Sequence, residues 1–340
     1  MGQLNHKLRA AALLPNNTKA VIYSCEGCAL SDNERSFFAE SAALGFVLFG
    51  RNCETPEQLR ALSDSLRDVV GWECPILIDQ EGGRVQRLKP PIWRGYPSMR
   101  TFGARAAIDM EGALSDLRFT VMQLSEELRA GGISVNCAPV LDVLIEATHD
   151  AIGDRAFSED PDIVSRLGLS VCRNFIDVGI TPIIKHIPGH GRAASDSHKD
   201  LPRVSASREE LQATDFKPFK DIAVSDIADQ VWAMAAHIVY EDIDAELPSS
   251  ASPSIINDVI RGDIGFDGLL VSDDLDMDAL AALGDVGQRS EAVLQAGCDV
   301  SLYCSGKLDD MQTIAKTVPN LSAKARKALQ KSVKALKLDA

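Results

Sequence analysis

The sequence predicts an α/β fold, a single-domain TIM-like (β/α)8 barrel that spans residues 1–340. Two observations favour it: short apolar runs rich in β-branched residues alternate with amphipathic stretches, and eight such strand–helix units fit in the chain. A third is that polar side chains directly follow several apolar runs, at the strand ends that converge on one face of a barrel. A doubly wound open sheet is the alternative.

Each element is predicted from its own stretch of sequence, in chain order. The SDNE stretch at 31–34 is typical of a helix cap, and Pro56 suits a first helical position. Residues 88–101 are predicted to be irregular. The expected strands are 20–24, 45–49, 75–78, 134–140, 180–184, 230–237, 268–272 and 299–303. The expected helices are 31–44, 55–70, 111–130, 161–178, 208–224, 252–261, 290–296 and a C-terminal helix at about 322–338.

Composition excludes several classes of function. The chain has 35 Lys and Arg against 49 Asp and Glu, a formal charge of -14, and no basic cluster suited to nucleic acid. No apolar stretch approaches the roughly 20 residues that span a bilayer, and the N-terminus has too short an apolar segment for a secretion signal. The eight cysteines are scattered, which favours reduced thiols. We therefore expect a cytoplasmic protein with neither a nucleic-acid nor a membrane partner.

The stretch 180–202 concentrates titratable side chains. Three of the six histidines of the chain lie in it, behind an apolar run that ends in charged residues. Such a run is typical of a buried strand that delivers polar groups to a site, and Pro188, Gly189 and Gly191 predict a loop. Within this loop, the carboxylate of Asp196 could orient the imidazole of His198 for proton transfer. The alternative is that both are solvated loop residues.

Two further groups are candidates for chemistry. Asp273 follows a buried strand, where a partly desolvated carboxylate can act as nucleophile or base; the alternative is that it or Asp274 caps the next helix. Asp79 shares a short stretch with Arg84 and Arg87, which could fork onto sugar hydroxyls or pair with the carboxylate. No spacing of histidines and cysteines suits a metal, so neither a metal nor another cofactor is expected.

Five motifs, taken together and in this order, resemble the signature of glycoside hydrolase family 3. The similarity is greatest to the single-domain bacterial β-N-acetylglucosaminidases of peptidoglycan recycling. Two positions depart from the common pattern, Ile187 and the stretch 276–278. The motifs are IDQEGGRVQR at 78–87, GDRAF at 153–157, KHIPGHG at 185–191, DSH at 196–198 and SDDL at 272–275.

The resemblance implies an exo-acting, retaining β-N-acetylglucosaminidase that acts on muropeptides in cell-wall recycling. It implies that Asp273 is the nucleophile and that His198, paired with Asp196, is the general acid/base. The partner is then a small carbohydrate, with a monomer favoured. A phosphorylase, a β-glucosidase of the same family and a catalytically silent sugar-binding protein are the alternatives. The residues implied to hold the terminal sugar are Asp79, Arg87, Arg155, Lys185 and His186.

Overall fold

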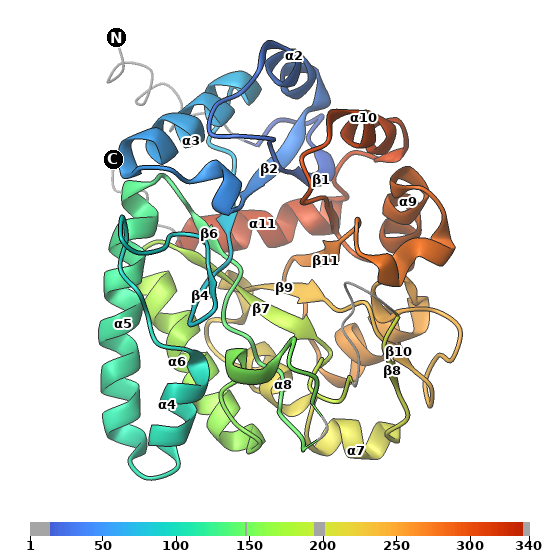
Figure 1. Ribbon diagram of the computed structural model, residues 1–340. Coiled ribbons are helices and arrows are strands. Elements are labelled where there is room, and N and C mark those ends of the chain that lie inside the picture. Colours follow the sequence, from blue (N-terminus) through green and yellow to red (C-terminus); the bar gives the residue numbers. More distant parts are fainter. Residues whose placement is uncertain (1–13, 147, 194–200, 336–340) are drawn as a thin grey trace.

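The strands close into one barrel (Figure 1). The computed structural model describes residues 14–146, 148–193 and 201–335. The strand order is β1-β12-β11-β9-β7-β6-β3-β2, and all neighbouring pairs are parallel. The predicted closed barrel is therefore confirmed, and the open-sheet alternative is wrong. The barrel strands are β1 Lys19–Tyr23, β2 Ala43–Leu48, β3 Ile76–Ile78, β6 Val135–Asn136, β7 Thr181–Ile187, β9 Trp232–Ala235, β11 Leu270–Asp274 and β12 Val300–Leu302.

Helices cover the outside of the barrel (Figure 1). Local sequence explains where two of them begin and end. Ser31 and Glu34 form a reciprocal capping box, and Thr55 caps the helix that starts at Pro56 and ends at the left-handed Gly71. Among the described residues the helices are α2 Asp32–Ser41, α3 Pro56–Val70, α4 Met99–Ala106, α5 Met110–Ala130, α6 Pro161–Asp177, α7 Arg208–Ala213, α8 Lys217–Ala223, the π-helix η5 Ile255–Asp263, α9 Val286–Ala296, α10 Leu308–Thr317 and α11 Ala323–Ala335.

The last helix, α11, packs where the barrel strands begin. Trp232, the first residue of β9, donates its indole N–H to Ser332 Oγ at 2.9 Å. Arg326 donates to backbone carbonyls just ahead of β1. The predicted closing helix at 322–338 is present from 323 to 335, and residues 336–338 lie outside the described residues.

The predicted helix 208–224 is wrong as one element, because the chain breaks into α7 and α8. Asp215 lies in the break and is buried, and its carboxylate accepts a hydrogen bond from Arg192 Nε at 2.7 Å. Pro218 then falls in the first turn of α8, where its missing N–H is tolerated, whereas the interior of a continuous helix would lose a bond there.

The predicted strand 134–140 is shorter than expected. Only Val135 and Asn136 form β6, since Pro139 has no N–H for a ladder, and Val140 makes an isolated bridge to Lys185. Helices α4 and α10 were not predicted from the sequence. Two small strand pairs were not predicted either, the hairpin of β4 Gln80–Gly82 and β5 Val85–Gln86 and the pair of β8 Arg203–Val204 with β10 Val239–Tyr240.

The barrel brings the polar strand ends to one face. Parallel strands covered by helices are buried on both sides, so their sequences are apolar until the strand ends. Asp79 follows β3, Lys185 and His186 lie near the end of β7, and Asp273 lies near the end of β11. Among the described residues, no helix is long and apolar enough to cross a membrane.

Candidate active site

A pocket of about 190 Å³ opens where the polar strand ends converge. Each residue that the resemblance assigned to catalysis or sugar binding, and that the structure describes, lines this pocket, although the segments that supply them are far apart in the sequence. Arg84, the other arginine considered for sugar hydroxyls, does not line the pocket and pairs with Asp154 at 2.8 Å. Asp196 and His198, the predicted acid/base pair, lie outside the described residues. The six that line the pocket are Asp79, Arg87, Arg155, Lys185, His186 and Asp273.

Asp79 is held between two cations. Lys185 Nζ lies 2.8 Å from Asp79 Oδ1, and Arg87 Nη2 lies 2.9 Å from Oδ2. Burial raises the pKa of the Asp79 carboxyl, but the two cations outweigh burial and hold the pKa well below its usual range. The two sequence interpretations therefore coexist: the arginine and the carboxylate pair with each other and also face the pocket.

A tight hairpin explains how Arg87 returns to Asp79. Gly82 and Gly83 have φ values of 97° and 57°, in the left-handed region that favours glycine, and a Cβ on Gly82 would lie 2.3 Å from the carbonyl oxygen of Pro97. After the turn, Gln80 Oε1 accepts the backbone N–H of Arg87 at 2.8 Å. The glycine pair of the motif thus has a backbone role.

Glu81 organises the other side of the pocket, and sequence analysis gave it no role. Its carboxylate accepts two hydrogen bonds from Arg155, both at 2.9 Å, and Oε1 lies 2.7 Å from Lys185 Nζ. Burial opposes ionisation, but the charges of Arg155 and Lys185 hold the pKa of Glu81 below its ordinary value. Asp79 and Glu81 are two residues apart, and in an extended chain residues at this spacing point to the same side. This spacing was the only sequence signal that both carboxylates could face one site.

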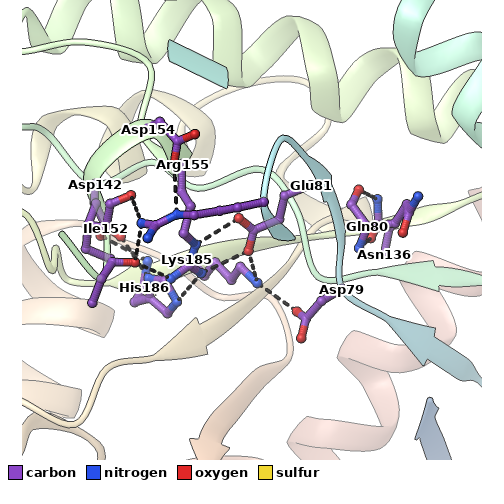
Figure 2. A network of polar contacts seen from close by, with 12 residues as sticks. Asp79, Gln80, Glu81, Asn136, Asp142, Ile152, Asp154, Arg155, Lys185 and His186 are labelled. Carbon is purple, nitrogen blue, oxygen red and sulfur yellow. Dashed lines mark hydrogen bonds and ion pairs between the residues drawn. The ribbon is translucent and has the colours of Figure 1, made fainter. Parts of the chain in front are cut away.

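Asp142 and His186 extend this network (Figure 2). His186 Nδ1 lies 2.7 Å from Asp142 Oδ2, and Arg155 Nη2 lies 3.4 Å from His186 Nε2. The contacts therefore run from Asp142 through His186, Arg155 and Glu81 to Lys185, and on to the carboxylate that follows β3. Asp142 lies 44 residues before His186 in the sequence, so no local pattern indicated that the two are partners.

Asp273 lies at the end of β11 and lines the pocket. Its Oδ1 accepts the backbone N–H of Asp274 at 2.8 Å. Burial raises the pKa of Asp273, but the nearby His186 and His237 and the amide of Asp274 outweigh burial, so the pKa lies below its ordinary value. The carboxyl is therefore ionised at neutral pH, as a nucleophile requires.

The alternative that Asp273 or Asp274 caps the next helix is wrong. Asp274 Oδ1 instead accepts backbone N–H groups from Cys304 at 3.0 Å and from Asp276 at 3.1 Å, which ties the end of β11 to the end of β12. Burial raises the pKa of Asp274 to about 6. The two neighbouring carboxyls thus differ in charge near that pH.

Apolar side chains complete the pocket wall. They were not predicted, because the sequence prediction was based on polar residues at strand ends. The guanidinium carbon of Arg87 lies 5.0 Å from the centre of the Phe49 ring, so Phe49 supports a predicted sugar contact. All eight cysteines are free, as expected, and among the described residues no group of His, Cys, Asp and Glu could hold a metal ion. The apolar wall includes Phe49, Cys137, Met234, Leu302 and Cys304.

A closed parallel barrel with an ionised carboxylate at one strand end, beside a pocket of paired acids and bases, has the features of a barrel enzyme whose site lies at the strand ends, and a glycoside hydrolase is one class that fits them. The chain belongs to glycosyl hydrolase family 3, because residues 12–337 match the N-terminal domain of that family. It is 38% identical to a beta-hexosaminidase of Alkalilimnicola ehrlichii over 82% of this chain and 79% of the relative. A beta-hexosaminidase of Stenotrophomonas maltophilia is also 38% identical, over 84% and 83%. The predicted enzyme class, a beta-hexosaminidase, is confirmed.

Solved structures agree with this placement. NagZ from Neisseria gonorrhoeae, in complex with N-trifluoroacetyl-D-glucosamine, aligns with a TM-score of 0.84 and 30% identity over 93% of this chain and 90% of that chain. A β-N-acetylglucosaminidase from a Paenibacillus species aligns with a TM-score of 0.81 and 29% identity, and the present chain spans 61% of its length.

Proposed function

We propose that the chain is an exo-acting, retaining β-N-acetylglucosaminidase that removes terminal N-acetylglucosamine from muropeptides in which this sugar is linked to anhydro-N-acetylmuramic acid. The observation that carries the proposal is the position of Asp273, which faces the same small pocket as five paired sugar-binding candidates. A pocket of about 190 Å³ has room for a terminal sugar residue, which supports exo action. The glucosamine derivative in the related NagZ supports the choice of sugar.

The reaction proceeds by double displacement. Asp273 attacks the anomeric carbon while His198, oriented by Asp196, gives a proton to the leaving oxygen, and the glycosidic bond breaks. His198 then takes a proton from water, which attacks the same carbon and releases Asp273. Two inversions restore the β configuration. The roles of His198 and Asp196 rest on the sequence motif.

The terminal sugar is held by the hydrogen-bonding groups of the network. Asp79 accepts from sugar hydroxyls, while Arg87, Lys185 and Arg155 donate to their oxygens. Because Asp79 and Glu81 already fix the cations, the groups stay in place without substrate, which lowers the cost of organising them on binding.

Turnover of 4-nitrophenyl β-N-acetylglucosaminide tests the proposal. The wild type should release nitrophenol, and Asp273→Asn should lose activity by about 10⁴-fold or more because its amide cannot attack. A wild type that binds N-acetylglucosamine without turnover would instead make the chain a silent sugar-binding protein. Comparable kcat/KM on the matching glucoside would favour the β-glucosidase alternative.

Two further assays separate the remaining alternatives. His198→Ala should reduce activity on poor leaving groups far more than on nitrophenyl glycosides, whose departure needs little protonation. Sugar 1-phosphate as the main product in phosphate buffer would overturn hydrolysis in favour of phosphorolysis.

Location and organisation are part of the same proposal. We propose a cytoplasmic location, which the eight free cysteines support because thiols stay reduced there. We further propose that residues 1–340 act as one domain and as a monomer. Accumulation of N-acetylglucosaminyl muropeptides in a deletion strain would support the cellular role.

A further inference from the structure

Asp142 is a buried carboxylate beside the site that the reaction described above does not use. Its side chain is completely buried and does not line the pocket. We propose that Asp142 is a positioning residue that holds His186 in one orientation and one tautomer, so that the ring presents a hydrogen-bond acceptor to the sugar. The inference rests on the proposed function in one respect, the contact between His186 and the terminal sugar.

One carboxylate holds both the ring and the backbone of His186. Asp142 Oδ2 lies 2.7 Å from His186 Nδ1, and Oδ1 accepts the backbone N–H of His186 at 3.1 Å. The same Oδ1 accepts the backbone N–H of His190 at 2.7 Å. Because the ring and the main chain of one residue are bound to one rigid group, the side-chain torsions of His186 have little freedom. The bond to His190 fixes the start of the following loop as well.

The charge of Asp142 decides which ring nitrogen carries the proton. Burial alone would raise its pKa, but its interactions with His186 and His190 outweigh burial and lower the pKa to about 2. The carboxylate can therefore only accept hydrogen bonds at neutral pH, so Nδ1 of His186 must be the donor.

The opposite nitrogen has a complementary partner. Arg155 Nη2 lies 3.4 Å from His186 Nε2, and a guanidinium can only donate. In a hydrogen bond with this guanidinium, Nε2 is the acceptor, so we assign the ring proton to Nδ1. A sugar hydroxyl between the two side chains can then donate to the imidazole and accept from the guanidinium. Figure 2 shows Arg155 and His186 in the same network of polar contacts.

Asp142→Asn is the direct test because it keeps the shape and removes the charge. The carboxamide NH₂ cannot accept a hydrogen bond. In one orientation it faces the Nδ1–H of His186, and in the other it faces the backbone N–H groups of His186 and His190, so one hydrogen bond is lost either way. We expect kcat/KM for the nitrophenyl N-acetylglucosaminide to fall by about 10- to 100-fold, the usual cost of losing the partner that orients a functional histidine.

A double-mutant cycle with His186→Ala separates positioning from a loss of folding. If Asp142 acts through His186, adding Asp142→Asn to His186→Ala should change kcat/KM by less than about threefold. A loss of the same factor in both backgrounds would overturn the inference. The matched control is Asp299→Asn, a carboxylate whose side chain is only 7% exposed and which pairs with Arg261 at 2.8 Å before β12 begins. It should change kcat/KM by less than about threefold.

A spectroscopic readout makes the test independent of turnover. Nitrogen-15 NMR, with the His186 signals assigned by their loss in His186→Ala, should show a protonated Nδ1 in the wild type and a protonated Nε2 in Asp142→Asn. A wild-type ring protonated on Nε2 and not on Nδ1 would contradict the inference, even if the variant does not fold. If the wild type fails to cleave N-acetylglucosaminides, the proposed function falls, and this spectrum still decides the role of Asp142.

Discussion

At the scale of single residues, the pocket is built from charges that neutralise one another before a sugar arrives. Glu81 is the central one, because its carboxylate binds both Arg155 and Lys185 and its side chain is only 1% exposed. A buried anion of this kind is stabilised by its ion-pair partners. Removing its charge leaves the buried cations of Arg155 and Lys185 with one fewer negative charge to pair with.

Glu81→Gln should therefore lower the free energy of unfolding by about 3 kcal/mol or more, measured by urea denaturation. It should also weaken sugar binding, because Arg155 loses its two-point anchor. The control is Glu111→Gln, which removes the exposed ion pair with Arg166 and should change the unfolding free energy by less than about 0.5 kcal/mol. Equal losses in the two variants would contradict the central role of Glu81.

His190 predicts a pH dependence of stability. Burial, together with the neighbouring His186, lowers the pKa of His190 to about 4, against about 6.5 in the unfolded chain. The unfolded state therefore binds more protons between these values. The resulting destabilisation is absent above about pH 6.5 and grows to about 3 kcal/mol as the pH falls to 4.

The comparison of wild type with His190→Asn isolates this effect. It is needed because Asp274, with a pKa near 6, changes stability in the opposite direction over part of the same range. The wild type should lose stability relative to the variant as the pH falls from 6.5 to 4. Urea denaturation at several pH values measures the difference in unfolding free energy between the two proteins. A difference that stays constant with pH would show that the pKa of His190 is not lowered on folding.

At the scale of elements, helix α4 supports the loop that carries Arg155. Gly103 lies on α4 against the backbone of Phe157, and a Cβ at Gly103 would fall 1.8 Å from the carbonyl oxygen of Phe157. Arg155 is only two residues earlier in that segment. A side chain at Gly103 would therefore push the loop, and with it the proposed sugar contact of Arg155, out of place.

Gly103→Ala should reduce kcat/KM by about tenfold or more, because a small displacement of a positioning group is costly, and should destabilise the fold by about 1–3 kcal/mol. Gly27→Ala is the matched control, since a Cβ at Gly27 has no neighbour within 4 Å. Steady-state kinetics and thermal unfolding of both variants make the comparison. An unchanged Gly103→Ala enzyme would mean that α4 does not support the site.

At the scale of the whole molecule, the barrel and the polar strand ends that line the pocket were predictable because both leave local signals, whereas Arg155 was indicated only by the family resemblance. Buried parallel strands are apolar until they end, and a carboxylate such as Asp273 stands out at that point. Helix α4 was missed because its sequence contains Gly103 and follows a proline-rich segment, so packing against the Arg155 loop stabilises it more than helix propensity does.

Partnerships between distant residues were not predictable. Glu81 and Arg155 are 74 residues apart, and Asp142 and His186 are 44 apart, so no spacing rule connects them. The parallel pairing of β3 with β6 and of β6 with β7 brings these segments together and creates the contacts. The apolar pocket residues such as Phe49 were not predictable either, because an apolar residue at a strand end cannot be distinguished in the sequence from an ordinary core residue.

The account centres on Asp273 as a nucleophile in a pocket for one terminal sugar. Proton NMR of the reaction with 4-nitrophenyl β-N-acetylglucosaminide, recorded before the product anomers equilibrate, tests this most directly. Double displacement predicts that β-N-acetylglucosamine appears first and that the α anomer grows in only by mutarotation. Initial appearance of the α anomer would mean a single inversion by water and would contradict the assignment of Asp273.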